Sequence, residues 1–465
     1  MQLKSILAVL ALVIPAAAQT PDMSITWLGQ SCFILKTAGG PTVIADPPVA
    51  SVGYTLPSLT ADAVTITHNH TDHNNSAAVS GSFTLVDGRP VTARQEMPGA
   101  GTNFVLIPGF HDNQNGALRG PNTMIVWTQA GMKIAHLGDL GQDSLTDAQL
   151  ADLQNVDILF IAAGGFFTVT PTQAAAYVKQ LKPRVAILMH YKTALGGPAQ
   201  LAALPAASDP FLPVTYKPNT VVVNKASLPA VQRESAGEVW VMQPLSDTEA
   251  VDSATYTLGM PVAPASAASA FGPFTGSQST AASGFPLPRK LGETEVFIDG
   301  KAVPLYYVSP GQVNYQVPKA TAAGQSLLEV HVGGQLVGRA PLTLTRTAPG
   351  IFVVLNQDGS MNSPTAPAHP GEVLQIYGTG LGEVSPGVDD GAAASAVNLS
   401  MTSSPPSVQL GTRLLRIQFS GLAPTTAGIY QVNAMIPADM PLGTAPLTLG
   451  NLLTSNAVQV TVAGN

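Results

Sequence analysis

The six residues HNHTDH at positions 68–73 are the most informative segment of this chain, because they hold three imidazoles and a carboxylate. The apolar run before them, residues 63–67, reads as a buried strand, which places the polar cluster in the loop at its C-terminal end. Imidazoles suit Zn, Mn and Fe, and a carboxylate favours a second ion. A single loop histidine is usually a polar surface residue. Three of the chain's eight histidines gather here, however, without helical spacing, so the stretch predicts a metal site.

Other polar residues follow apolar runs in the same way. Nine runs read as strands: residues 24–28, 32–36, 42–45, 63–67, 104–107, 123–128, 133–137, 158–162 and 185–189. Asp46, His111, Asp139 and His190 each come at or just after the C-terminal end of such a run. We therefore expect these four side chains to gather with the histidine cluster at one edge of a sheet.

Helical patterns in the first half are few. Residues 144–155 open with Ser and repeat Leu, and residues 170–181 begin with Thr-Pro, which puts proline in the first turn of a helix. Together with the strands, they predict a mixed sheet with helices, in an α/β or α+β arrangement.

Length and composition limit the classes of protein. A chain of 465 residues suggests about two to four domains. Its formal net charge of -7, with 11% charged residues, gives no basic patch for nucleic acid. Cys32 is the only cysteine, so no intrachain disulfide can form, and its apolar neighbours favour a buried small side chain over a nucleophile.

The first eighteen residues have the pattern of a signal peptide. Lys4 gives the positive end, residues 6–14 are apolar, and the small residues PAAA at 15–18 form a cleavage site. A membrane anchor is the alternative, but the apolar run is shorter than the roughly 20 residues that a span needs. We expect an exported protein, periplasmic or extracellular, with no membrane span.

The second half has another character. From about residue 233, helical periodicity disappears, residues 262–283 are rich in Ala, Ser, Gly and Pro, and short alternating strands follow. The sequence QVNYQVP at 312–318 returns as QVNAMIP at 431–437, and Gly324 returns as Gly443 at the same spacing. These repeats predict two related β-domains in tandem, without a catalytic constellation.

The order HxHxDH, a later His, Gly-Asp and a final His resembles the metallo-β-lactamase fold superfamily of metal-dependent hydrolases over about residues 22–224. The segments ITWLGQSCFIL (25–35), ADPP (45–48), HLGDLG (136–141) and MHYKT (189–193) are similar to the branch of L-ascorbate-6-phosphate lactonase-like and UPF-type hydrolases, and not to the antibiotic-degrading branch.

The resemblance implies a complete set of seven metal ligands. The first metal site would take His68, His70 and His111, the second would take Asp72, His73 and His190, and Asp139 would bridge both metals. Asp46 matches a residue that orients a ligand imidazole, and His136 matches a position that is not a ligand.

Two divalent ions, with Zn favoured over Mn or Fe, would then share a hydroxide that attacks an ester, lactone, amide or phosphodiester. Asp72 and Asp139 would be catalytic as well as ligands, with Asp72 accepting a proton. Tyr191 or Lys192 would reach a developing oxyanion, although surface exposure is the simpler role for Lys192. The segment AAGGFF at 162–167 departs from relatives with a polar residue there, and its apolar wall argues against a phosphorylated sugar.

The second half resembles the Ig-like C-terminal modules of exported proteins from certain soil bacteria, over about residues 255–462. The resemblance rests on PLYYVSPGQVNYQVP (304–318), APGIF (348–352) and IYGTGLGEV (376–384). It implies a structural or adhesive tail that spaces the hydrolase or contacts a cell-surface or extracellular polymer.

We therefore predict a multidomain chain: an αβ/βα metallo-β-lactamase sandwich followed by two Ig-like all-β sandwiches. The predicted bounds are a signal peptide at 1–18, a hydrolase head at 20–230, a linker at 231–254, and sandwiches at 255–350 and 351–465. Its substrate would be a small molecule. The alternative is a non-catalytic surface or binding protein that keeps the head as a scaffold, but a complete ligand set favours the enzyme.

Overall fold

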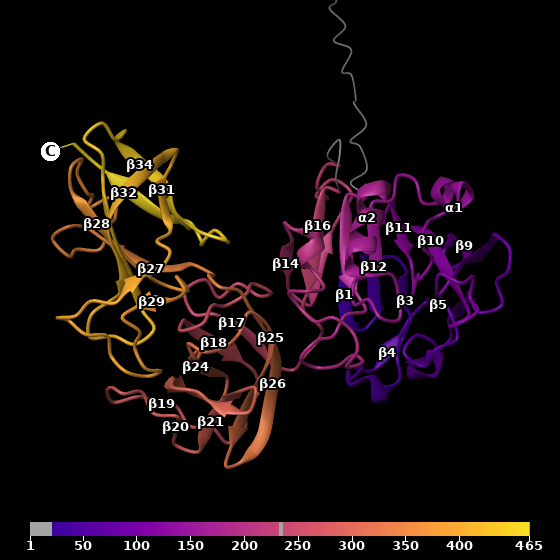
Figure 1. Cartoon of the computed structure of the whole chain (residues 1–465), viewed down its shortest axis with the longest axis horizontal. Coiled ribbons are helices and arrows are strands. Elements are labelled where there is room, and N and C mark those ends of the chain that lie inside the picture. The colour runs from indigo at the N-terminus through magenta and orange to yellow at the C-terminus, as the bar shows by residue number, and fades with distance from the viewer. Residues whose placement is uncertain (1–20, 232–235, 465) are drawn as a thin grey trace, which may run out of the picture.

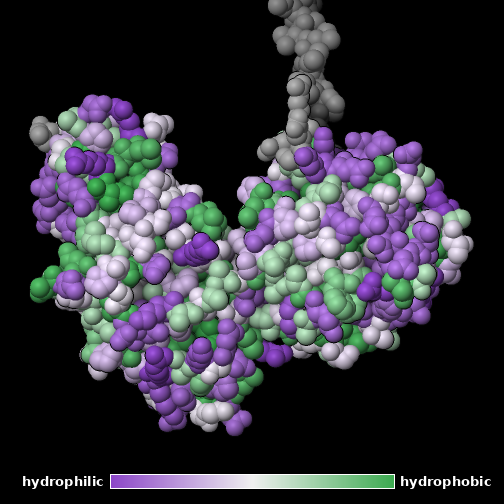
Figure 2. Space-filling model, viewed as in Figure 1, coloured by the Kyte–Doolittle hydropathy of each residue, from purple (hydrophilic) through white to green (hydrophobic). Residues whose placement is uncertain are grey.

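The computed structural model describes residues 21–231 and 236–464, so the predicted signal peptide lies outside the described residues. It shows a mixed head followed by an all-β tail (Figure 1). Figure 2 shows hydrophilic and hydrophobic residues mixed over the visible face of both parts. Within the described residues, no helix is long and apolar enough to cross a membrane.

Two sheets form the head. The six-stranded sheet has the order β15 (Thr220–Val223), β1 (Met23–Gly29), β2 (Cys32–Thr37), β3 (Thr42–Ala45), β5 (Ala63–Ile66) and β7 (Thr84–Asp87). The eight-stranded sheet has the order β14 (Thr215–Lys217), β16 (Glu238–Met242), β13 (Val185–Met189), β12 (Ile158–Ala162), β11 (Met132–His136), β10 (Pro121–Gln129), β9 (Thr102–Phe110) and β8 (Gln95–Gly99). All nine strands predicted in the head are confirmed, within a few residues at each end.

The two sheets pack face to face around one core. Phe33 of β2 and Phe160 of β12 meet across the interface with ring centroids 4.3 Å apart, and Trp27 of β1 packs against Tyr191 at 5.2 Å. All four side chains belong to the same buried cluster. Burial of such aromatic side chains is the main force that holds the sheets together.

The helices cover the outside of the eight-stranded sheet. α2 (Pro171–Leu181) begins as predicted, with Thr170 and Gln173 capping each other's backbone N–H groups and proline in the first turn. α1 (Asp147–Asp152) is shorter than the helix predicted at 144–155. Its capping pair is Thr146 and Gln149, so the chain enters the helix two residues later than its first Ser suggests.

The outer face of the six-stranded sheet has a smaller apolar cluster. Cys32 lies there, fully buried beside Leu28 and Ile44, as predicted for a small apolar side chain. The cover over this face contains the short strands β4 (Leu59–Thr60) and β6 (Val79–Ser80). The 3-10 turns at Ala50–Val52 and Ser76–Ala78 lie in the segments after β3 and β5. A third 3-10 turn, Asp209–Phe211, contacts α2.

The predicted linker at 231–254 is wrong over part of its length. β16 lies within that range, yet it pairs in parallel with β13 through Val185–Glu238, Ala186–Val239 and Ile187–Trp240. Its side chains join the core of the head. The run EVWVM is apolar enough to be an inner strand, so the head extends to at least Met242.

The tail contains two further cores, one for each half. The first half has a sheet of β17 (Glu249–Asp252), β18 (Ala267–Phe271), β24 (Gln312–Gln316), β23 (Leu305–Val308) and β19 (Thr280–Ala281), and another of β20 (Lys290–Leu291), β21 (Thr294–Ile298), β22 (Lys301–Ala302), β25 (Gly324–Val332) and β26 (Gln335–Leu344). The second half consists of β27 (Gly350–Leu355), β28 (Val373–Thr379), β29 (Val384–Ser385), β30 (Met401–Thr402), β31 (Ser407–Leu410), β32 (Arg413–Leu422), β33 (Tyr430–Met435), β34 (Gly443–Gly450) and β35 (Val458–Val462).

The repeated sequence occupies the same kind of position in both halves. QVNYQ forms β24, between β18 and β23, and QVNAM lies in β33, between β28 and β32. Both are inner strands whose alternate side chains are buried. The tail is therefore an all-β region of two related units.

Candidate metal centre

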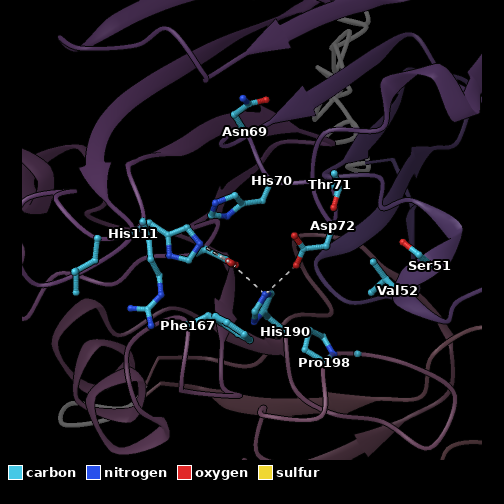
Figure 3. A pocket seen from close by; sticks show the side chains of 14 residues that line it. Ser51, Val52, Asn69, His70, Thr71, Asp72, His111, Phe167, His190 and Pro198 are labelled. Atoms are coloured by element: carbon cyan, nitrogen blue, oxygen red, sulfur yellow. Dashed lines mark ion pairs between the residues drawn. The ribbon is translucent and has the colours of Figure 1, made fainter.

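Five strands deliver the candidate ligands to one place. Asp46 follows β3, the segment 67–73 follows β5, and His111, Asp139 and His190 follow β9, β11 and β13. The strands come from both sheets, so the cluster forms where the two sheets open at one edge. Figure 3 shows His70, His111, Asp72 and His190 directed toward a common centre. The structure thus brings together all seven residues that the sequence predicted as ligands.

The first group consists of His68, His70 and His111, whose nearest ligand atoms all lie within 4.8 Å of one another. Nε2 of His68 is 3.0 Å from Nδ1 of His70. The rings of His68 and His111 meet edge to face, with centroids 4.7 Å apart. Ring nitrogens that converge in this way can share one metal ion.

The second group contains Asp72, His73, Asp139 and His190, within the same limit of 4.8 Å. Nε2 of His190 lies 3.1 Å from Oδ2 of Asp139 and 3.5 Å from Oδ2 of Asp72. Nε2 of His73 lies 3.3 Å from Oδ1 of Asp139. Two carboxylates and two imidazoles can therefore hold another ion.

Asp139 connects the groups. Its Oδ2 atom is 3.1 Å from Nε2 of His111 and also 3.1 Å from Nε2 of His190. The backbone N–H of Asp139 donates to Oδ1 of Asn122, which fixes the loop after β11. Gly138, with φ of 55°, lies so close to Thr67 and Asn122 that a Cβ atom there would collide with both.

A second set of contacts orients the cluster. Asp46 accepts hydrogen bonds from the backbone N–H and the hydroxyl of Thr67, and its Oδ2 atom lies 2.8 Å from Nδ1 of His73. Nε2 of Gln30 donates to Oδ2 of Asp72 at 2.9 Å. These partners hold the ligand side chains in place before any ion binds.

Burial and neighbouring charges shift the pKa values of several residues in the cluster. Burial alone would lower the pKa of His190, but Asp139 and Asp72 outweigh it and raise that pKa to about 9. Burial would raise the pKa of Asp139, but His190 and His73 hold it well below its ordinary value. Burial lowers the pKa of His68, which favours the neutral imidazole that binds metal.

The donor atoms of the cluster fit the binding of divalent metal ions. Nε2 of His73 and Oδ1 of Asp139 are buried and lie 3.3 Å apart, and neither makes a well-aligned hydrogen bond with the other or with another described residue. Leaving such atoms unpaired is costly, and both face the centre of the cluster. Imidazole nitrogens and carboxylate oxygens are the donor set that Zn and similar ions take.

The predicted role of Tyr191 is contradicted by its position. The side chain is fully buried in the core of the head, and its hydroxyl donates to the carbonyl oxygen of Met242 at 3.2 Å. Burial raises the pKa of this hydroxyl well above its ordinary range. Lys192 donates instead to the carbonyl oxygen of Gly197, and neither residue lines the cavity.

His136 holds the position predicted for a histidine that is not a ligand. It is fully buried, and its ring nitrogens contact the carbonyl oxygen of Ser31 and the backbone N–H of Gly138. It therefore supports the loop that carries Asp139.

The cluster opens into a cavity of about 620 Å³. Its lining includes ligands and also Leu118, Arg119, Phe167 and Pro198. Neither Arg119 nor the contact of Gln30 with Asp72 was predicted from the sequence. The signal for Arg119 was weak: it lies in a Gly- and Asn-rich loop directly after a candidate ligand.

Comparisons with known proteins agree with this geometry. The family model described as "Beta-lactamase superfamily domain" matches residues 24–190. A UPF0173 metal-dependent hydrolase from Methanoculleus marisnigri is 30% identical over 190 residues, covering 37% of this chain and 82% of that protein. Another from Myxococcus xanthus is 28% identical, covering 38% of this chain and 74% of that protein.

A solved structure from Thermotoga maritima, of a protein assigned to the same superfamily, is 28% identical, with a TM-score of 0.38, and covers 48% of this chain and 100% of that one. The family model falls within the head, and the matched hydrolases are covered over most of their length. Through its head, the chain belongs to the metallo-β-lactamase superfamily of metal-dependent hydrolases.

Proposed function

We propose that the head is a binuclear hydrolase that holds two divalent metal ions, with Zn favoured, and cleaves an ester, lactone, amide or phosphodiester bond. The position of Asp139 supports this best, because one oxygen lies 3.1 Å from a ring nitrogen in each ligand group. His68, His70 and His111 would hold one ion, and Asp72, His73 and His190 the other. Such ions activate water and polarise the substrate oxygen.

The chain's own residues prepare the site for that chemistry. Asp46 fixes the ring of His73, and Gln30 fixes the carboxylate of Asp72. The side chain of Asp72 is 21% exposed whereas that of Asp139 is 2% exposed. A proton can therefore pass between Asp72 and the cavity, while Asp139 stays shielded and serves to position the two ligand groups. No Ser or Cys nucleophile is required.

The proposal also includes the export of the protein and a role for its tail. The pattern at residues 1–18 supports export. The tail, as two Ig-like modules, would space the head or contact a polymer outside the cell. The competing function is a binding protein that keeps the head as a scaffold, and metal loading with turnover separates the two.

The test is elemental analysis of the full chain after metal-replete expression, followed by assays on lactones, phosphodiesters and β-lactams. We expect close to two ions per chain. Asp139→Ala should lose metal and reduce turnover by orders of magnitude, whereas Asp147→Ala, at an exposed position in the first turn of α1, should keep the ions. Protein without metal after such growth would contradict the proposal, and metal-loaded protein inactive on every substrate would favour the scaffold.

A further inference from the structure

A rigid loop begins one residue after the ligand His111. Asp112 is 3% exposed, and its carboxylate accepts four backbone hydrogen bonds. Oδ1 accepts from Gln114 and Gly116, and Oδ2 accepts from Leu118 and Arg119, at 2.7 to 2.9 Å. A carboxylate with so many donors holds the backbone firmly. The loop therefore presents Leu118 and Arg119 at a fixed place beside the metal centre.

Arg119 offers a cation to the cavity. Its guanidinium donates to the carbonyl oxygen of Phe166 at 3.1 Å and lies 5.8 Å from the ring centroid of Phe167. Among the described residues, no carboxylate forms an ion pair with it. These contacts orient the group but leave its charge uncompensated, and most of its five N–H donors stay free. A planar, oriented cation of this kind suits a bidentate oxyanion.

The wall next to Arg119 is apolar and exposed. Leu118 is 62% exposed and Phe166 is 60% exposed, and the rings of Phe166 and Phe167 meet edge to face with centroids 4.7 Å apart. Phe166 also has a φ of 54°, a strained conformation for an aromatic residue. Of these three side chains, Leu118 and Phe167 line the cavity, so they give it an apolar wall beside Arg119. Figure 3 shows Phe167 on the same side of the cavity as His190.

We propose that the substrate of this site is an amphiphilic anion. Its carboxylate or phosphate-type oxyanion would bind Arg119, its apolar chain or ring would lie against Leu118 and Phe167, and its hydrolysable bond would reach the ligand cluster. This proposal rests on the proposed hydrolase function. It agrees with the expectation that the apolar segment 162–167 argues against a phosphorylated sugar, and it adds a cation, Arg119, which the loop at 112–120 places against Phe166 and Phe167.

The test uses matched hydroxamates on the metal-loaded full chain, with binding measured by calorimetry. Each of the butano-, hexano- and octanohydroxamic acids is paired with the mono-hydroxamate of the diacid of equal carbon number, in which a carboxylate replaces the terminal methyl group. The hydroxamate group binds the metal centre in both members of a pair. The difference in affinity within a pair therefore measures the contribution of Arg119 to binding the carboxylate. At one chain length or more, we expect the anionic partner to bind about tenfold more tightly. The neutral series should bind more tightly as the chain lengthens.

Variants assign the effect to a residue. Arg119→Gln should abolish the preference for the carboxylate and leave the neutral series unchanged, and Arg119→Lys should keep part of it. Arg94→Gln is the matched control, because it removes the same charge from an exposed arginine that pairs with Glu96 and Asp152. Equal affinity within every pair would overturn this inference and leave the hydrolase proposal standing. The same holds if Arg119→Gln still prefers the carboxylate. If no hydroxamate binds, the hydrolase proposal fails and this one with it.

Discussion

The Nδ1 atom of His73 lies 2.8 Å from the Oδ2 atom of Asp46, and both side chains are fully buried. A carboxylate at this nitrogen selects the tautomer whose Nε2 atom is free to bind metal. The same carboxylate also accepts two hydrogen bonds from Thr67, just before the histidine cluster. One buried side chain thus aligns a ligand ring and the loop that supplies the other ligands.

Asp46→Asn should weaken metal binding without unfolding the head. The amide keeps the shape but not the charge, so His73 becomes a less basic ligand, and we expect metal affinity to fall by about 10- to 100-fold. Competition with a chelating dye measures this. Asp147→Asn, at an exposed position in the first turn of α1, is the control. Unchanged affinity in the Asp46 variant would show that His73 needs no such support.

Tyr191→Phe should keep turnover and lose stability. Its hydroxyl donates to Met242 inside the core and does not reach the cavity, so kcat/KM should stay within about threefold of wild type. Losing the donor leaves a buried carbonyl oxygen unpaired, which costs about 1 to 3 kcal/mol of unfolding free energy. Thermal melts and steady-state kinetics on the same preparation test both parts. A large fall in kcat with normal stability would show that Tyr191 has a catalytic role.

A chain of residues 19–246 should fold and bind metal, whereas residues 19–230 should not. The shorter chain lacks β16 and exposes the edge of β13, the strand that leads into His190. It also removes Trp240 and Met242 from the core. Solubility, circular dichroism and metal content compare the two. Equal behaviour would mean that β16 is dispensable.

Asp252 should make the stability of the first tail unit depend on pH. Burial raises its pKa to about 6, although Oδ1 accepts hydrogen bonds from Ala254 and Thr255. The folded state therefore holds a proton that the unfolded chain has already lost, so the unfolding free energy falls as pH rises from about 4 to about 6. The loss is complete above that range.

Asp252→Asn keeps the Oδ1 acceptor and removes the charge. It should raise stability at pH 7 by up to about 3 kcal/mol, the equivalent of a shift of roughly two pKa units, and change little at pH 4. Denaturant titrations at both pH values measure the difference. An equal effect at the two pH values would exclude ionisation of Asp252 as the cause.

The convergence of the candidate ligands could be predicted from the sequence because the carboxyl ends of parallel strands meet at one edge of a sheet. Each candidate directly follows an apolar run, and the ends of such runs meet at one edge whatever the lengths of the intervening loops. Tyr191 was misplaced for a related reason: consecutive residues at a strand end point in opposite directions, so the neighbour of a residue that faces the cavity faces the core.

Two other features depend on contacts that lie far apart in the sequence. EVWVM at β16 is a short apolar run that follows the change of composition near residue 233, and its pairing with β13, about 50 residues earlier, assigns it to the head. Arg119 is one of several surface arginines in the sequence. Its significance comes from the fold of the loop around Asp112 and from Phe167, which no local pattern reveals.

The position of β16 also sets the order in which the parts of the chain can fold while it is synthesised, starting at the N-terminus. The eight-stranded sheet is complete only when Met242 has appeared, and it needs no later residue as a strand partner. The cores of the two tail units begin beyond that point and follow one another along the chain. Each unit can therefore close before its successor is available. For two units with related inner strand sequences, QVNYQ in β24 and QVNAM in β33, this order of folding protects against exchange of strands between them.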